Sequence, residues 1–249
     1  MREILIIFQR DFREIRQSNT FRIICALSLL LLVGVSLGAS IVLNRQSWLG
    51  ETAARPFLVM ITGIITYFVP LFILMAFVWA FASLPVTREK ANGNIECLIA
   101  TPISPRTLWL GKSLAIFLPG FLISCIVTCI IILIINLSTL MPVTGVFILP
   151  LPGLLTGFII NPLLIFGTLS LIILLSLISN PDVAVAPSFL VGFGLMIGMM
   201  LGLALGVISF NSWIFLGGYL GGTFALWMVV LHFSRYLVTE RIVLSSKGD

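Results

Sequence analysis

Six long apolar runs dominate this sequence and restrict how it can fold. Each run is at least 20 residues long and contains no Asp, Glu, Lys or Arg. A run of about 18 or more uncharged apolar residues is long enough to cross the hydrocarbon core of a bilayer as a helix. We therefore expect an all-α membrane protein with six transmembrane helices, at Ile23–Leu43, Phe57–Ser83, Ser113–Ile135, Leu154–Ser179, Ser188–Ile208 and Trp213–His232.

The composition agrees with this class and leaves little chain for anything else. Hydrophobic residues make up 59% of the 249 residues and charged residues only 9%, whereas a soluble domain is about a quarter charged. The first apolar run is 21 residues long, too long for a cleaved signal peptide, so we expect it to be retained. We expect an N-terminal amphipathic helix in 1–22, a six-helix transmembrane domain in 23–232 and a C-terminal tail in 233–249.

The basic residues predict which side of the membrane each end occupies. With the N-terminus inside and six crossings, twelve basic residues fall inside and two, Arg45 and Arg55, fall outside. Cytoplasmic loops carry such an excess of Lys and Arg. We therefore expect a multi-pass protein of the cell membrane with both termini in the cytoplasm. Its pI of about 9.4 then reflects topology and anionic lipid, with no nucleic-acid partner.

The expected spans lack the side chains that several kinds of membrane protein need. Between Arg55 and Arg88, and between Lys112 and Asp182, there is no ionisable Asp, Glu, Lys, Arg or His. This argues against a proton-coupled carrier, although a sodium site built from carbonyls and hydroxyls stays open. Cys125 and Cys129 share a helix face without a third metal ligand nearby, so we expect no metal site.

The chain also lacks the chemistry for using ATP or catalysing a reaction by itself. It contains one His and no paired carboxylates within an expected span, which gives an intramembrane hydrolase no support. It contains no GxxxxGK[ST] phosphate-binding loop. We therefore expect no enzyme activity and no cofactor in this chain, and any energy must come from another polypeptide.

The N-terminal segment is expected to form an amphipathic helix over residues 2–17. Leu5, Phe8, Phe12 and Ile15 recur at spacings of three and four, with charged residues between them. Such a helix lies on the membrane surface, either as a simple anchor or as a lever against a cytoplasmic partner. Both interpretations stay open.

Prolines and asparagines predict interruptions in the second half of the chain. Residues 136–153 carry no charge and three prolines, so we expect them to lie in the outer interface or to re-enter the membrane rather than to be helical. Asn161-Pro162 and Asn180-Pro181 are expected to mark helix ends.

Glycines at intervals of four follow the last two expected spans. Small residues at this spacing let two helix backbones approach closely in lipid. The stripe serves either packing within the chain or contact with a second subunit. The glycines concerned are Gly194, Gly198, Gly202 and Gly206 in the fifth span, and the pairs Gly217 with Gly221 and Gly218 with Gly222 in the sixth.

Residues 87–112, between the second and third spans, carry six of the 23 charged residues of the chain. Asn92-Gly93 predicts a turn, and Asn94 is then placed to cap a short helix over Ile95–Ala100. Glu96 falls in the first turn of that helix, where the helix dipole favours an acid. A short capped helix with acidic and apolar groups suits docking to a cytoplasmic protein, the alternative being a solvated loop.

A second helix is expected to follow at once. Ser104 is placed to cap it, with Pro105 at the first helical position, and it runs through Trp109 and Lys112 into the third span. Trp109, near the end of that span, is expected to lie at the membrane interface.

These residues carry a family resemblance. The stretch resembles the cytoplasmic loop of ABC-2 type permeases, the membrane subunits of ATP-binding-cassette exporters, over 26 residues. The matching positions are Arg88-Glu89-Lys90, Gly93, Glu96, Leu98, Thr101-Pro102-Ile103-Ser104 and Gly111-Lys112.

The resemblance implies that this chain is the membrane subunit of an exporter. In that family a six-helix permease dimerises, and each half binds a separate cytoplasmic ATPase subunit, which holds the ATP and Mg. The 23–232 region would be the permease domain, its partner a second copy or a paralogue, and the loop between spans two and three would supply the coupling helix. The N-terminal helix would brace that helix, and the implied ATPase contact comprises Glu89, Gly93, Glu96, Leu98 and Thr101.

Two other functions stay open. The same loop would serve a non-transporting membrane anchor or sensor that docks a cytoplasmic signalling protein, and a carrier or channel without ATP ranks third. The sequence also departs from the family in one respect. ABC-2 relatives often place re-entrant helices between the last two spans, whereas Ser188 to His232 is only 45 residues, nearly all needed for two crossings.

Overall fold

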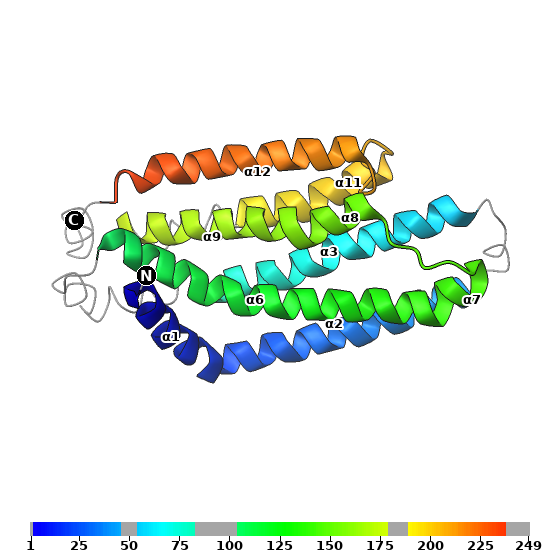
Figure 1. The fold of residues 1–249 in the computed structure, drawn as a ribbon, viewed down its shortest axis with the longest axis horizontal. Helices are drawn as coiled ribbons and strands as arrows, with labels where there is room; N and C mark the ends of the chain where they lie inside the picture. Colours follow the sequence, from blue (N-terminus) through cyan, green and yellow to red (C-terminus); the bar gives the residue numbers. More distant parts are fainter. Residues whose placement is uncertain (1, 46–53, 83–103, 179–188, 238–249) are drawn as a thin grey trace.

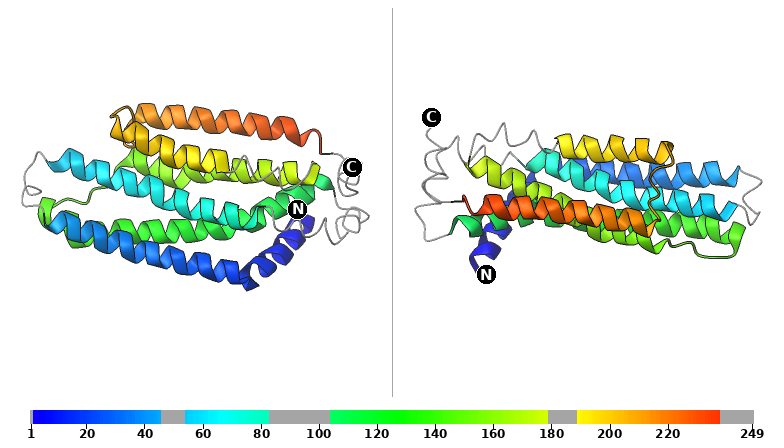
Figure 2. Two further views of the ribbon diagram at one scale, coloured as in Figure 1. Left: turned by 180° about the vertical axis from the view of Figure 1, so that it is seen from behind. Right: turned by 90° about the horizontal axis from the view of Figure 1, so that it is seen from above.

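The computed structural model describes residues 2–45, 54–82, 104–178 and 189–237, and the secondary structure of these residues is helical without a strand. Most helices run lengthwise through an elongated bundle, and α1 crosses one end of it at an angle (Figures 1 and 2). Five helices are long and apolar enough to cross a membrane. In chain order the elements, with π-helical segments marked η, are α1 (Arg2–Gln17), α2 (Asn19–Asn44), α3 (Arg55–Phe81), α6 (Pro105–Ile135), η3 (Asn136–Leu140), α7 (Met141–Thr144), α8 (Leu151–Leu155), η4 (Thr156–Ile160), α9 (Asn161–Ile178), η5 (Gly194–Gly198), α11 (Met199–Ala204) and α12 (Trp213–Ser234).

Helix α6 lies at the centre of the packing. It contacts α1, α2, α3 and α9, while α12 packs mainly on α9. At the crossing of α3 and α6, a Cβ on Gly120 would come within 2.8 Å of the Phe77 ring. Close approach of this kind is how helices associate in lipid, where burying apolar surface supplies no force between them.

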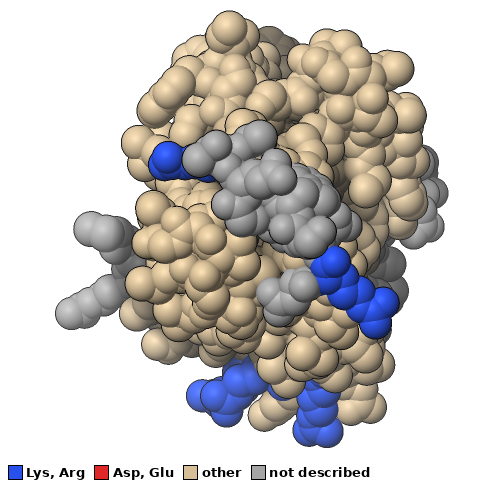
Figure 3. Space-filling view, turned by 90° about the vertical axis from the view of Figure 1, so that its right-hand side faces the viewer, with Lys and Arg blue, Asp and Glu red and all other residues tan. Residues whose placement is uncertain are grey.

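The long helices alternate in direction, so the bundle has two distinct ends. The end beside α1 contains the end of α3, the start of α6, the end of α9 and the end of α12 (Figure 1). The described basic residues of this end include Arg10, Arg13, Arg16, Arg22, Arg106, Lys112 and Arg235. The described basic residues at the opposite end are Arg45 and Arg55. The described atoms on that face are mostly uncharged (Figure 3). The described residues therefore show the charge asymmetry that the sequence predicts.

The fifth expected span is a shorter helix than predicted. It runs from Phe189 to Ala204, which at 1.5 Å per residue is about 24 Å, less than the roughly 30 Å of a hydrocarbon core. Gly206, at φ 71°, ends it: the Gly206 amide donates to Leu203 O (3.0 Å) and the Val207 amide to Gly202 O (2.9 Å). Only glycine adopts this backbone conformation readily, so the helix stops before the predicted end at Ile208.

Residues 136–144 are helical, and the prediction that the prolines would keep residues 136–153 out of a helix was wrong for this part. The helix that begins at Pro105 continues to Thr144 through the π-helical turn η3. Asn136, which is fully buried, stabilises the transition: its Nδ2 donates to Ile132 O (3.0 Å), and its Oδ1 accepts from the Ile148 amide (2.8 Å). One side chain therefore satisfies the helix and the returning segment together.

The glycines divide into those that pack within the chain and those that do not, and this difference predicts their tolerance of substitution. A Cβ on Gly157 would strike the carbonyl oxygen of Thr66, which is backbone and cannot rotate away. We expect Gly157→Ala to lower the free energy of unfolding by about 1–3 kcal/mol. Thermal unfolding in detergent, followed by tryptophan fluorescence, measures this.

Gly221→Ala on α12 is the matched control. A Cβ there meets no described atom within 4 Å, so better helix propensity should leave stability unchanged or raise it by up to about 1 kcal/mol. Equal midpoints for the two variants would contradict the close approach of η4 to α3.

Candidate functional site

The start of α6 is built as the sequence predicts. Ser104 is the N-cap, and its Oγ accepts from the Thr107 amide at 3.2 Å. Pro105 follows in the first helical turn, where its missing amide hydrogen costs nothing. The Ser104 cap and Pro105 therefore account for two of the amide groups that the first turn of a helix leaves without a partner.

Helix α1 packs directly on these first turns of α6. A Cβ on Gly111 would lie 2.9 Å from Cγ2 of Ile7, so the two backbones are as close as glycine allows. The buried face of α1 consists of Ile7, Asp11 and Ile15, whereas Leu5 is 55% exposed. The buried face is thus rotated from the apolar face that the spacing predicts, because α1 packs on α6.

An ion pair joins the two helices at this contact. Lys112 Nζ lies 3.3 Å from Asp11 Oδ2, and the two side chains are only 1% and 6% exposed. The other carboxylate oxygen, Asp11 Oδ1, lies 3.3 Å from Nε of Arg10, whose side chain is half exposed. Taking both charges out of water costs several kcal/mol, so this pair requires α1 and α6 to keep one register.

Trp109 joins the same part of α6 to α9. Its indole Nε1 donates to the Ser170 carbonyl of α9 at 2.7 Å, and the residue is 5% exposed. The expectation that Trp109 lies at the lipid interface was therefore wrong. The base of α6 is held by α1 through Lys112 and by α9 through Trp109, which makes it the most constrained part of this end.

The predicted ATPase contacts lie outside the described residues. They are Glu89, Gly93, Glu96, Leu98 and Thr101, all within 83–103. The described chain resumes at Ser104, three residues after Thr101. We call the contact of α1 with the first turns of α6, centred on Asp11 and Lys112, the α1–α6 junction.

The four glycines of the expected fifth span lie in three different settings. Gly194 and Gly198 are exposed, and a Cβ on either would meet no described atom within 4 Å. Gly202 packs against Ile208 of the following turn, and Gly206 ends the helix. Within the described chain, Gly194 and Gly198 therefore take no part in helix packing, and their role in a subunit contact stays a prediction.

A second polar cluster lies inside the bundle and was not predicted. Pro70 in α3 cannot donate a helical hydrogen bond, which disturbs the carbonyls one turn earlier. Asn161 Nδ2 donates to one of these, Tyr67 O, at 2.9 Å, and the Tyr219 hydroxyl of α12 donates to Asn161 Oδ1 at 2.7 Å. The Tyr67 hydroxyl lies 3.5 Å from that of Tyr219.

Asn161 therefore links three helices rather than ending one. It lies where η4 passes into α9, within a continuous helix from Leu151 to Ile178, so the expectation that Asn161-Pro162 marks a helix end was wrong. A buried Asn beside a proline is the signal that could have indicated the cluster. The partners Tyr67 and Tyr219 are 94 and 58 residues away along the chain, beyond the reach of local pattern.

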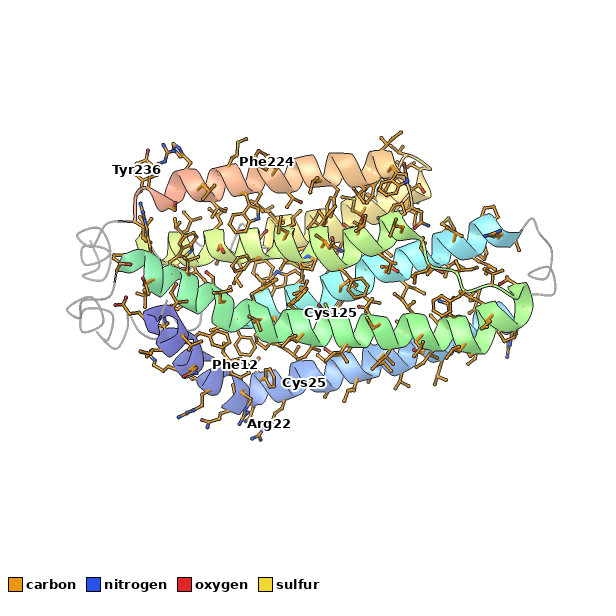
Figure 4. All side chains as sticks on the ribbon, viewed as in Figure 1. Phe12, Arg22, Cys25, Cys125, Phe224 and Tyr236 are labelled. Atoms are coloured by element: carbon orange, nitrogen blue, oxygen red, sulfur yellow. The ribbon has the colours of Figure 1, made fainter. Side chains whose placement is uncertain are left out.

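The cysteines show no sign of a metal site in the described residues. Cys25 lies on α2 and Cys125 on α6 (Figure 4), and with Cys129 they are free thiols. The described part of the chain contains no group of three His, Cys, Asp or Glu side chains that could hold a metal ion.

Taken together, the apolar helices, five of them long enough to cross a membrane, indicate a helical membrane protein. Comparison of the chain with protein-family models, with curated proteins and with solved structures finds no match.

The α1–α6 junction predicts an asymmetric response to substitution. Lys112→Met leaves the Asp11 carboxylate buried without its lysine, and we expect a loss of about 3–5 kcal/mol together with release of α1. Asp11→Leu/Lys112→Met removes both charges and should recover most of that loss. Thermal unfolding and hydrogen exchange of residues 2–17 report the two effects.

Arg10→Gln is the control for this experiment. Arg10 also contacts Asp11 but its side chain is half exposed, so solvent screens the pair and the loss should stay below about 1 kcal/mol. A double variant as unstable as Lys112→Met would show that the ion pair does not hold the two helices together.

The interior cluster gives a separate prediction. Asn161→Leu leaves the Tyr67 carbonyl and the Tyr219 hydroxyl without their amide partner, which should lower stability by about 1–3 kcal/mol. Thr168→Val is the control, because its hydroxyl bonds only the Leu164 carbonyl of its own helix (3.0 Å) and should cost under about 1 kcal/mol. Similar unfolding temperatures for the two variants would contradict a role for Asn161 between helices.

Proposed function

We propose that this chain is the permease subunit of an ATP-driven exporter of the ABC-2 type. Two copies, or this chain and a paralogue, form a substrate path in the membrane, and separate cytoplasmic ATPase subunits supply the energy. The observation that carries the proposal is the α1–α6 junction: a buried ion pair between Lys112 and Asp11 lies at the point where the 87–112 loop enters the third span. That loop is the stretch that resembles the ATPase-binding loop of these permeases.

The position of the charges supports an external energy source. Among the described residues, the buried charged side chains are Asp11 of α1 and Lys112 of α6, and they pair with each other at one end of the bundle. A proton-driven carrier needs titratable groups along its path, whereas a nucleotide-driven permease needs only a mechanical connection to its ATPase. The capped start of α6 is suited to that connection.

The arrangement of charge supports the orientation. By the positive-inside rule, the end of the bundle that contains α1 and the start of α6 faces the cytoplasm. Five helices are long enough to cross, and we assign the sixth crossing in this proposal to the segment that contains the shorter Phe189–Ala204 helix. Six crossings place both termini on the cytoplasmic side.

In the proposed mechanism, closure of two ATPases on ATP pushes the helix expected over Ile95–Ala100 toward the membrane. Ser104 and Pro105 carry the movement into α6 without bending, and the Lys112–Asp11 pair makes α1 move with it. Trp109 transfers the same movement to α9 through the Ser170 carbonyl. The substrate path then changes the side to which it opens.

The exposed glycines support a dimer in this proposal. Gly194 and Gly198 lie one turn apart on the surface of the Phe189–Ala204 helix, with no described atom within 4 Å of a Cβ. A groove of this kind admits a second helix closely. Substituting both glycines by Leu should therefore weaken permease dimerisation.

Purification of the tagged chain from its native membrane tests the proposal. We expect an ATPase subunit to copurify and its ATP hydrolysis to rise in the complex. Glu96→Arg, which reverses a charge in the proposed contact, should reduce retention of the ATPase by at least about tenfold.

Glu51→Arg makes the same change in the loop expected outside and should leave retention unaltered. Retention of the ATPase by Glu96→Arg would contradict the assigned contact. A copurifying kinase or regulatory protein would favour the membrane sensor, and the absence of any cytoplasmic partner would favour a carrier or channel without ATP.

A further inference from the structure

An apolar groove of about 470 Å³ runs between the Phe189–Ala204 helix and α12, with α9 as its floor. The two wall helices follow each other along the chain and lie at the edge of the bundle (Figures 1 and 2). The groove is lined by Leu164, Val191, Leu195, Met199, Phe215, Gly218, Tyr219, Gly222 and Leu226.

The side chains that line the groove are almost entirely apolar. Tyr219 carries the single hydroxyl among these side chains, and that hydroxyl donates to Asn161 at 2.7 Å. A polar solute or a water molecule in the groove would lose hydrogen bonds that the lining does not replace, at a cost of about 1–3 kcal/mol per group. The chemistry therefore selects an apolar occupant.

Two glycines keep the groove open. A Cβ on Gly218 or Gly222 would meet no described atom within 4 Å, so neither glycine is required for packing inside this chain. They remove side-chain volume from the wall between Phe215 and Leu226. A space of this kind, left empty, would forfeit the dispersion contacts of its lining, so the surrounding medium fills it.

The length of the groove identifies the part of the medium that fits. From Phe215 to Leu226 it follows 11 residues of α12, which is about 16 Å, or half of a hydrocarbon core of roughly 30 Å. It begins near Trp213, an exposed aromatic residue at the start of α12, and ends near the middle of that helix. This is the depth covered by the acyl chains of one leaflet.

A helix from another protein does not fit the same space. A helix with side chains is about 10–12 Å wide, so it would lie over this open groove and only its side chains would enter. A second copy of this chain could place only single side chains there.

We infer that this groove is a binding site for one acyl chain of a membrane lipid, from the leaflet adjacent to the start of α12. The chain lies along Gly218 and Gly222 and contacts Leu195 and Met199 on the opposite wall. The inference does not depend on the proposed transport function, because it rests on the lining, the length and the position of the groove alone.

A photoreactive diazirine analogue of methionine at position 199 tests this site. The full-length protein is reconstituted in vesicles of phosphatidylethanolamine and phosphatidylglycerol, illuminated and examined by mass spectrometry. We expect an adduct of one phospholipid at position 199. Gly222→Leu fills the groove and should reduce the adduct roughly tenfold, since about two methylene groups lose their contacts.

Gly221→Leu is the matched control, because Gly221 lies on the same helix but lines a separate groove of about 670 Å³ with Phe224, whose side chain points away from the bundle (Figure 4). This variant should change the adduct by less than about twofold. Equal adducts in the two variants, or no lipid adduct in the parent protein, would overturn the inference. A crosslink from position 199 to a second copy would also overturn it and would identify that copy as the occupant.

Discussion

The structure depends above all on the need to satisfy backbone hydrogen-bonding groups in an apolar medium. Helices meet that need within themselves, and at three places where a helix is interrupted or ends, an asparagine side chain bonds the backbone. Asn161 bonds a carbonyl near Pro70, Asn136 serves both a π-helical turn and the segment that returns from it, and Asn211 Nδ2 donates to Val59 O at 2.6 Å. These side chains fix how the helices pack because each one bonds the backbone of another part of the chain or of an interrupted turn.

The buried ion pair stabilises the fold in a different way from the asparagines. Asp11 and Lys112 are charged groups that a bilayer interior would not tolerate, and they occur at the end of the bundle where the other described basic residues gather. Each charge is compensated only while α1 lies on α6. The pair therefore makes the amphipathic helix part of the membrane domain, whereas amphipathicity alone would allow it to lie anywhere on the membrane surface.

The spacing of residues in the sequence correctly predicted the structural features that depend on residues close together in the chain. The amphipathic α1, the Ser104 cap with Pro105 after it, and most of the long apolar helices are features of this kind. Prediction was less successful where distant contacts compete with local preference. Prolines in residues 136–153 did not prevent a helix to Thr144, because Asn136 and the π-helical turn compensate for the change in hydrogen bonding. Trp109 is buried because the Ser170 carbonyl lies within reach of its indole.

The sequence by itself determined that the chain is helical and apolar enough for a membrane, and which of its ends is basic, because hydropathy and charge are properties of the residues in order. Only the tertiary structure decided that Asp11 meets Lys112, that Asn161 joins Tyr67 to Tyr219, and that the glycines of α12 border open grooves. These contacts join residues from 58 to 101 positions apart, and such pairings depend on how whole helices cross rather than on any local spacing. The amphipathic helix could be predicted from the spacing of its apolar residues. The face that it buries could not, because that face depends on how α1 packs on α6.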